Sequence, residues 1–238
     1  MTIELQRATD PDDLARQAAA FIAAEAWNAF EARGRFAMAV SGGSTPAPMF
    51  EALAEMTIPW GEVDLFQVDE RIAPTGHPDR NLGDLAAHLL GRVIIPWRNV
   101  HPMPVNAEDP DTAADWYAGK LQDVCGGVLD LVHLGLGDDG HTASWPPGHT
   151  EVDTWSGDVG VTAPFNGRAR LTLTPAAVNR ARLVLWLVSG AAKAPSVTAL
   201  LVRDPVVPGI PANRVTVERQ ILFGDDAALD RLPGGYGP

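Results

Sequence analysis

Cysteine is almost absent from the chain: Cys125 stands alone among 238 residues. A disulfide needs two cysteines, so an internal disulfide framework is excluded, and such low usage is typical of a reducing compartment. Positive charge is also scarce, because 18 Lys and Arg residues stand against 30 Asp and Glu residues, a net charge of −12. This charge repels nucleic acids and anionic lipids, so we expect neither nucleic acid nor a membrane as partner.

Long apolar runs are missing as well. The longest, such as residues 183–188, have the length of a strand and fall far short of a membrane span. The first residues, MTIELQRATD, contain neither the basic nor the apolar region of a secretory signal. We therefore expect a cytoplasmic protein, a monomer or small homo-oligomer. The 46% apolar content suffices for a sizeable core, and the length predicts one domain over residues 1–238.

Apolar runs of strand length alternate with segments of helical period. The predicted strands are 3–8, 36–40, 63–68, 99–103, 129–134, 170–174, 183–189 and 221–223. The predicted helices are 10–33, 46–56, 81–90, 111–124 and 191–202. This alternation indicates an α/β fold with a mostly parallel sheet flanked by helices. We expect residues 146–167 to form an excursion from this fold and residues 233–238 to be frayed.

Polar, glycine-rich clusters follow the predicted strands and not the helices. These clusters are residues 41–45, 69–71, 135–141 and 190–193. In open α/β sheets the carboxyl ends of the strands form the ligand crevice. The four clusters are therefore predicted to converge on one site.

The first cluster, Ser41-Gly-Gly-Ser-Thr-Pro46, joins a strand to a helix. Its two glycines let the backbone approach a ligand closely, and the helix N-terminus offers free N–H groups and the positive end of a dipole. That geometry suits a phosphate. A tight turn in which Ser or Thr caps the helix is the alternative. The spacing matches neither a Walker A loop nor a dinucleotide-binding fingerprint.

The densest cluster, Gly135-Leu-Gly-Asp-Asp-Gly-His-Thr-Ala-Ser144, presents two carboxylates and an imidazole beyond a strand. Histidine titrates near neutrality and can take a proton from water, so His141 and the neighbouring Asp139 are candidate catalytic residues. The alternative is a histidine that only fills a turn. A metal site is not expected, because His133, His141 and His149 do not have a known zinc spacing.

Basic residues are few, so their positions are informative. An anionic substrate needs local positive charge in an acidic chain, and Arg168, Arg170 and Lys193 can supply it. Lys193 lies in the first turn of a predicted helix, where the dipole disfavours a cation, which favours a binding role. Asp69-Glu-Arg71 could bind sugar hydroxyls and an anion or form a surface ion pair.

These motifs in this order, Ser-Gly-Gly-Ser-Thr-Pro, Asp-Glu-Arg, Gly-Leu-Gly-Asp-Asp-Gly-His-Thr-Ala-Ser, Arg-Leu-Thr-Leu-Thr and Gly-Ala-Ala-Lys, resemble the 6-phosphogluconolactonase family. The resemblance covers about residues 36–225. It implies the fold shared with glucosamine-6-phosphate deaminase and ribose-5-phosphate isomerase. It also implies hydrolysis of 6-phosphogluconolactone to 6-phosphogluconate in the oxidative pentose phosphate pathway, without a metal or organic cofactor.

The resemblance also implies roles for individual residues. His141 corresponds to the general base that activates water, and Asp69 and Arg71 line the site. The groups around the substrate phosphate correspond to Gly42, Gly43, Ser44, Thr45, Arg170 and Lys193. The chain departs from the family at Asp138, where Pro is usual, at Trp145-Pro146-Pro147, where Leu-Phe-Pro is common, and at Arg80, where Ser is usual. The departure at Asp138 implies a differently braced loop, and the one at Arg80 could alter substrate contacts.

Two other functions remain open at this point. An amino-sugar phosphate isomerase-deaminase resembles the chain in its phosphate and histidine loops, but that family has Asp-Glu-Tyr in place of Asp69-Glu-Arg71 and Ile-Ala-Phe-Asn-Glu in place of residues 142–146. A non-catalytic sugar-phosphate binding module is the other alternative, and intact His141, Arg170 and Lys193 oppose it. A lactonase assay separates these functions.

Overall fold

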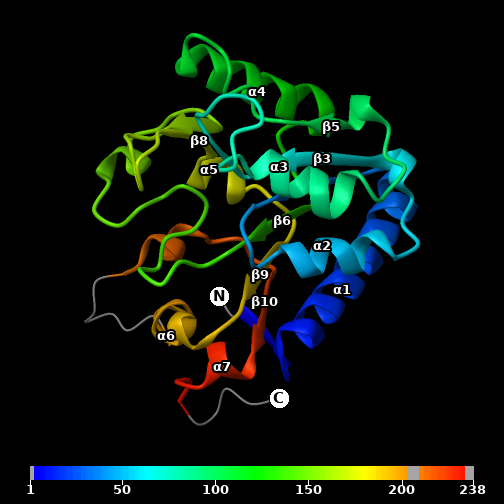
Figure 1. Cartoon of the computed structure of the whole chain (residues 1–238), viewed down its shortest axis with the longest axis vertical. Coiled ribbons are helices and arrows are strands. Elements are labelled where there is room, and N and C mark those ends of the chain that lie inside the picture. Colours follow the sequence, from blue (N-terminus) through cyan, green and yellow to red (C-terminus); the bar gives the residue numbers. More distant parts are fainter. Residues whose placement is uncertain (1–2, 203–208, 234–238) are drawn as a thin grey trace.

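A computed structural model describes residues 3–202 and 209–233 (Figure 1). Within these residues a seven-stranded sheet has the order β1-β10-β9-β6-β2-β3-β5, and its neighbouring strands all pair in parallel. Its strands are β1 (Ile3–Ala8), β2 (Phe36–Val40), β3 (Val63–Gln67), β5 (Val100–His101), β6 (Leu131–Leu134), β9 (Val184–Val188) and β10 (Gln220–Asp225). The predicted α/β class with a mostly parallel sheet is confirmed.

A second, antiparallel sheet lies beside the first and has the order β4-β8-β7. Its strands are β4 (Asp69–Arg71), β8 (Arg170–Leu173) and β7 (Val159–Val161). The prediction missed this sheet: it treated residues 69–71 as a polar cluster and placed no strand in residues 146–167. Strands of three residues are too short to show a period of two, and β7 contains Gly160, whose missing Cβ leaves room for the Trp155 ring.

Seven α-helices are described. They are α1 (Pro11–Arg33), α2 (Ala47–Ala54), α3 (Asn81–Leu85), α4 (Pro110–Cys125), α5 (Pro175–Val178), α6 (Ala194–Val202) and α7 (Asp226–Leu229). The predicted helix 81–90 becomes π-helical after α3, the predicted helix 191–202 starts with a 3-10 turn (η5, Ala191–Lys193), and α5 was not predicted. Of the tail predicted to fray, residues 234–238 lie outside the described part of the chain.

Local sequence accounts for the ends of α1. The Asp10 side chain accepts a hydrogen bond from the Asp13 backbone N–H, and Pro11 occupies the first turn, where it has no hydrogen bond to lose. At the other end Gly34 takes a φ of 73°, a left-handed conformation that glycine adopts without steric cost. No helix of the described residues combines the length and the hydropathy needed to cross a membrane.

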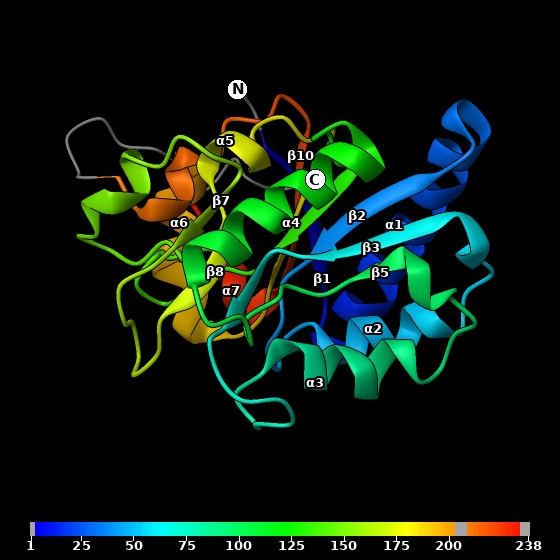
Figure 2. The same ribbon diagram turned by 90° about the horizontal axis from the view of Figure 1, so that it is seen from above.

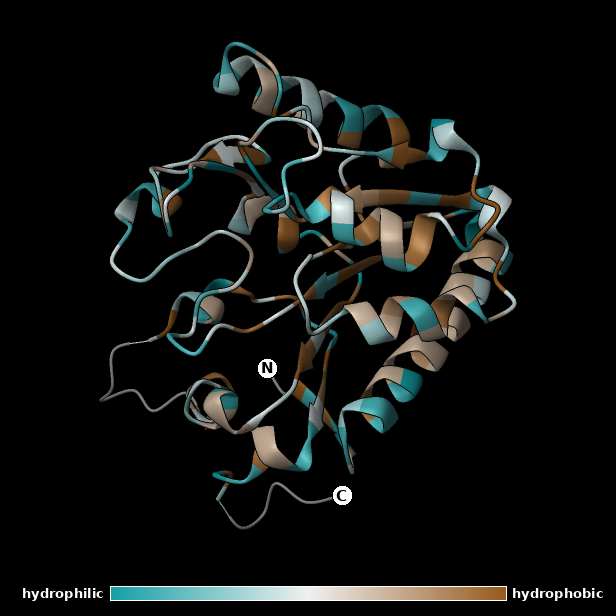
Figure 3. Cartoon of the chain, in the orientation of Figure 1, coloured by the Kyte–Doolittle hydropathy of each residue, from teal (hydrophilic) through white to brown (hydrophobic). Residues whose placement is uncertain are grey.

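Alternate residues of each central strand pack on opposite faces of the sheet. In β2, Phe36, Met38 and Val40 pack with α1 and α2, whereas Ala37 and Ala39 face the core that α4 covers. Figure 2 shows α2 and α3 on the side of the sheet opposite α4. In Figure 3 strand β3 is largely hydrophobic, whereas hydrophilic residues are frequent on α1 and α4. Both faces of the sheet are therefore buried, which is typical of a parallel sheet.

The buried carboxylate of Glu70 joins the second sheet to α3. It accepts hydrogen bonds from the backbone N–H groups of Arg71, Asn81 and Leu82 at 2.7–2.8 Å. It also forms an ion pair with Arg80, whose Nε lies 3.2 Å from Oε2. Arg80 stands at the cap position of α3 and has no acceptor to offer, so Glu70 satisfies the free N–H groups of this helix instead.

We predict that Glu70→Gln lowers the free energy of unfolding by about 3–5 kcal/mol, because it leaves the buried Arg80 guanidinium without its counter-ion. Denaturant unfolding measures this change. Glu55→Gln is the control. It also removes one negative charge, but the Glu55 side chain is exposed, so the free energy of unfolding should change by less than about 0.5 kcal/mol. Equal effects of the two substitutions would contradict the role given to Glu70.

Candidate active site

A pocket of about 220 Å³ opens at the carboxyl ends of three adjacent strands, β2, β6 and β9. After β2 the next strand of this sheet is β3, which lies toward the β5 edge. After β6 the next strand of this sheet is β9, which lies toward the β1 edge. Ligands of open α/β sheets bind where the chain directions diverge in this way. The convergence predicted from the polar clusters is therefore found at the switch point of the sheet.

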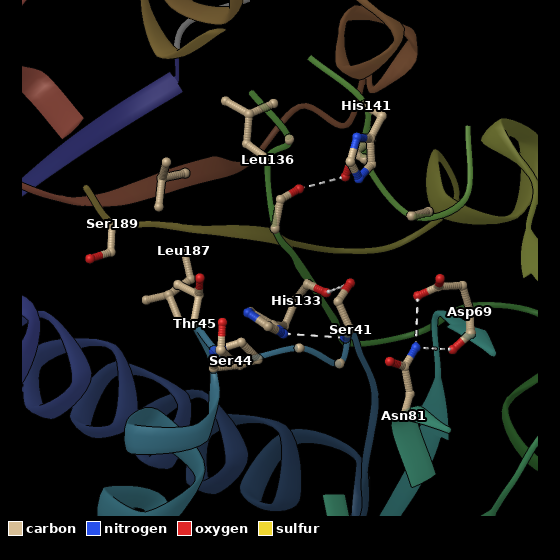
Figure 4. A pocket seen from close by; sticks show the side chains of 18 of the residues that line it. Ser41, Ser44, Thr45, Asp69, Asn81, His133, Leu136, His141, Leu187 and Ser189 are labelled. Carbon is tan, nitrogen blue, oxygen red and sulfur yellow. Dashed lines mark hydrogen bonds between the residues drawn. The ribbon is translucent and has the colours of Figure 1, made fainter. Parts of the chain in front are cut away.

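All of the predicted catalytic and binding residues except Asp139 and Arg168 line this pocket. Those residues are Gly42, Gly43, Ser44, Thr45, Asp69, Arg71, His141, Arg170 and Lys193. In the view of Figure 4, His141 lies on the side of the pocket opposite Ser44 and Thr45, with His133 between them. The prediction missed Asn81, His133 and Ser189 as pocket residues.

His141 is held by its neighbour Asp139. The ring Nδ1 lies 2.6 Å from Asp139 Oδ1, and the His141 backbone N–H donates to the same oxygen at 3.0 Å. Partial burial raises the pKa of Asp139, but the hydrogen bonds from the backbone and ring of His141 outweigh it, so that the pKa is lowered overall. An ionised Asp139 keeps the proton on Nδ1, which leaves Nε2 free to accept a proton.

Glycine is required beside His141 because the loop closes tightly on the ring. A Cβ at Gly137 would lie 2.1 Å from His141 Nδ1 and 2.6 Å from Asp139 Oδ1. The Gly137 N–H also donates to the His141 carbonyl at 2.8 Å, which closes the loop. The glycines of this loop thus set the position of the imidazole.

We predict that Gly137→Ala reduces turnover at least tenfold, because the added methyl group displaces the His141 ring from Asp139. Steady-state kinetics on a folded variant measures the change. Gly119→Ala in α4 is the control: its Cβ meets nothing within 4 Å, and alanine in a helix should raise stability by up to about 1 kcal/mol. Full activity of Gly137→Ala would show that the tight contact does not govern the ring.

The loop after β2 presents backbone groups to the pocket. Gly43 has a φ of 108°, and a Cβ at Gly42 would lie 2.2 Å from Asn81 Oδ1, so both positions need glycine. Pro46 occupies the cap position of α2, and no side chain caps this N-terminus. The alternative in which Ser or Thr caps the helix is therefore wrong, and the free N–H groups of the first turn remain open to an anion.

Three cationic side chains line the pocket, and each contacts oxygen atoms of the chain. Arg170 is buried, with its Nη1 3.4 Å from Ser144 Oγ and 3.8 Å from Asp69 Oδ2. Its Nε makes no hydrogen bond to the described residues, and burial lowers its pKa, although the charge of Asp69 opposes this effect. Arginine is so strongly basic that the side chain nevertheless remains charged at neutral pH.

Arg71 and Lys193 are the other two cations. Arg71 Nη1 donates to Asn81 Oδ1 at 2.5 Å and to the Asp79 carbonyl at 3.0 Å. Lys193 Nζ lies 2.6 Å from Asp138 Oδ1.

By contrast Arg168, a candidate from the sequence, pairs with Asp79 at 2.5 Å and is not among the residues of the pocket. Arg80 likewise does not line the pocket, because Glu70 holds it.

His133 lies in β6, as predicted, and lines the pocket. Its Nδ1 accepts a hydrogen bond from the Ser41 backbone N–H at 3.3 Å, whereas Nε2 has no partner among the described residues. Burial lowers its pKa to about 3, so the ring is neutral at working pH. Within the described residues no three His, Cys, Asp or Glu side chains gather as a metal site requires.

We predict that His133 makes the protein sensitive to acid. The unfolded chain protonates this ring near pH 6.5 and the folded chain only near pH 3, so the unfolded state binds more protons between these values. The free energy of unfolding therefore falls on acidification, by about 2 kcal/mol from this group at pH 5. Unfolding of His133→Leu at pH 7 and pH 5 should show a difference smaller by that amount. An unchanged difference would contradict a neutral, buried ring.

The fold places the chain in the α/β class whose ligands bind at the carboxyl ends of a parallel sheet. The family described as glucosamine-6-phosphate isomerases/6-phosphogluconolactonase matches residues 9–223, so the chain belongs to this family. It is 38% identical to the 6-phosphogluconolactonase of Synechocystis sp., over 80% of this chain and 82% of the relative. It is 34% identical to the human 6-phosphogluconolactonase, over 84% and 82% of the two chains.

Solved structures show the same fold. The 6-phosphogluconolactonase of Thermotoga maritima superposes with a TM-score of 0.84 at 27% identity, covering 94% of this chain and 99% of that chain. A monomeric glucosamine-6-phosphate deaminase superposes with a TM-score of 0.83 at 16% identity, a likeness that shows the fold alone. The predicted deaminase-like fold is confirmed.

Proposed function

We propose that the chain is a 6-phosphogluconolactonase: it hydrolyses 6-phosphogluconolactone to 6-phosphogluconate in the oxidative pentose phosphate pathway. One observation carries the proposal. A single pocket holds both an imidazole fixed by a carboxylate and an uncapped helix N-terminus accompanied by cations. Relatives named 6-phosphogluconolactonase at 34–38% identity favour this activity over that of an isomerase-deaminase.

His141 is the general base in the proposed reaction. Its side chain is 29% exposed, so water can reach the ring. Nε2 takes a proton from water as the water oxygen attacks the lactone carbonyl carbon, and the tetrahedral intermediate then expels the ring oxygen. The imidazolium returns the proton to that oxygen, so the products are a hydroxyl group and a carboxylic acid, which ionises. Asp139 stabilises the imidazolium in between.

The substrate phosphate is bound by backbone groups across the pocket from His141 and by two cationic side chains. The backbone N–H groups of the Gly42–Thr45 loop and of the first turn of α2 donate to its oxygens. Arg170 and Lys193 neutralise its charge at short range, which a chain of net charge −12 requires. Asp69 and Arg71 line the site between phosphate and lactone. The reaction needs neither a metal ion nor an organic cofactor.

We predict that His141→Ala lowers turnover by about 10²- to 10⁴-fold, or 3–5 kcal/mol, the usual contribution of a general base. Binding of 6-phosphogluconate should survive, because the substitution leaves the protein groups that bind the phosphate unchanged. Rates on freshly prepared lactone, corrected for spontaneous opening, measure the change.

Near-normal turnover by a folded His141→Ala protein would contradict this role of His141.

We predict that Arg170→Ala weakens binding of the phosphorylated substrate about ten- to a hundredfold, because a charge-assisted hydrogen bond contributes about 1.5–3 kcal/mol. Arg170→Lys should rescue only in part, since an ammonium group lacks the guanidinium fork. Gluconolactone, which has no phosphate, is the control: the wild type should turn it over poorly, and Arg170→Ala nearly equally poorly. Equal losses with both substrates would show that Arg170 does not bind the phosphate, and Arg71 would be the next candidate for that role.

A further inference from the structure

Lys193 lines the pocket, but its ammonium group is already paired. Nζ lies 2.6 Å from Asp138 Oδ1, the shortest distance to a carboxylate among the three cations of the described pocket. Asp138 itself does not line the pocket, and its side chain is 63% exposed, against 25% for Lys193. The carboxylate therefore lies at the rim and pairs there with a charge on which the phosphate site depends.

Both partners of this ion pair are fixed by their backbones. The carbonyl of Asp138 accepts a hydrogen bond from the buried Ser196 hydroxyl at 2.7 Å, which ties the histidine loop to α6. The Gly190 N–H donates to the Asp225 carboxylate at 3.0 Å, which anchors the turn that carries Lys193. These hydrogen bonds hold the two backbone segments that carry Asp138 and Lys193.

We propose that Asp138 is an internal competitor for the phosphate site, an inference that rests on the proposed function. In the empty pocket its carboxylate occupies Lys193. When a phosphate dianion binds, the ammonium group must be shared or released, and the two anions repel each other. Asp138 therefore lowers the affinity of the pocket for phosphate ligands.

The chemistry of the reaction gives this competition a use. Hydrolysis keeps the phosphate and creates a carboxylate, so the product carries more negative charge than the substrate. A cradle that binds phosphate tightly would retain the product. Because the Asp138 carboxylate can pair with the Lys193 ammonium group again, it speeds the release of the phosphorylated product.

The test is a set of substitutions that each remove one charge, probed with inorganic phosphate and 6-phosphogluconate. Asp138→Asn leaves the backbone carbonyl that Ser196 binds in place, and it removes only the charge. We expect inhibition constants for both probes to fall by about three- to tenfold, the range of a partly exposed ion pair and the relieved repulsion. Asp115→Asn, an exposed carboxylate on α4, removes the same charge away from the pocket and should change neither constant.

Lys193→Met separates this inference from the proposed function. If Lys193 holds the phosphate, Lys193→Met weakens binding of both probes, and Asp138→Asn added to it restores only the part that the repulsion between the two anions accounts for. If Lys193→Met binds both probes as tightly as the wild type, Lys193 does not contact the phosphate, and that part of the proposed function fails together with the inference.

If Lys193→Met weakens binding but Asp138→Asn fails to tighten it, only the competition is overturned. The same holds if Asp115→Asn tightens binding as much as Asp138→Asn, because the effect then belongs to net charge.

Discussion

The geometry of the pocket depends on one buried carboxylate, that of Glu70. It satisfies the free N–H groups of α3 and thereby places Asn81. Asn81 in turn donates to the Asp69 carbonyl at 2.9 Å, accepts from Arg71, and lies so close to the Gly42–Thr45 loop that Gly42 has no room for a side chain. Hydrogen bonds that lead back to a residue outside the pocket therefore position Asp69 and Arg71, and the loop packs against the same Asn81.

Electrostatics in this chain works over short distances. With a net charge of −12, the protein as a whole repels an anionic ligand, and only local groups can attract one. The cations of the pocket are accordingly held by oxygen atoms that position them: Arg170 by Ser144 and Asp69, and Lys193 by Asp138. Each pairing orders a long side chain in advance, and in the proposed account Asp138 also competes with the ligand. The balance of these two effects sets the affinity.

The parallel sheet and the convergence of the loops were predictable, because long apolar runs and polar clusters at strand ends are local features of the sequence. The second sheet was not, since β4 and β7 have three residues each and exist only through pairing with β8. His133 and Asn81 were not predicted to line the pocket, because an isolated polar residue shows no pattern and only the fold reveals that it faces the pocket. Arg168 was a candidate by composition, but Asp79 holds it elsewhere.

The central claim is that this pocket catalyses the opening of a phosphorylated sugar lactone. The most direct measurement is the initial rate at which the purified protein consumes freshly generated 6-phosphogluconolactone, with the spontaneous rate subtracted. The account predicts an enzyme-dependent rate that is proportional to protein concentration and yields 6-phosphogluconate. A rate no greater than spontaneous hydrolysis, from a folded protein that still binds 6-phosphogluconate, would contradict it and leave a sugar-phosphate binding protein.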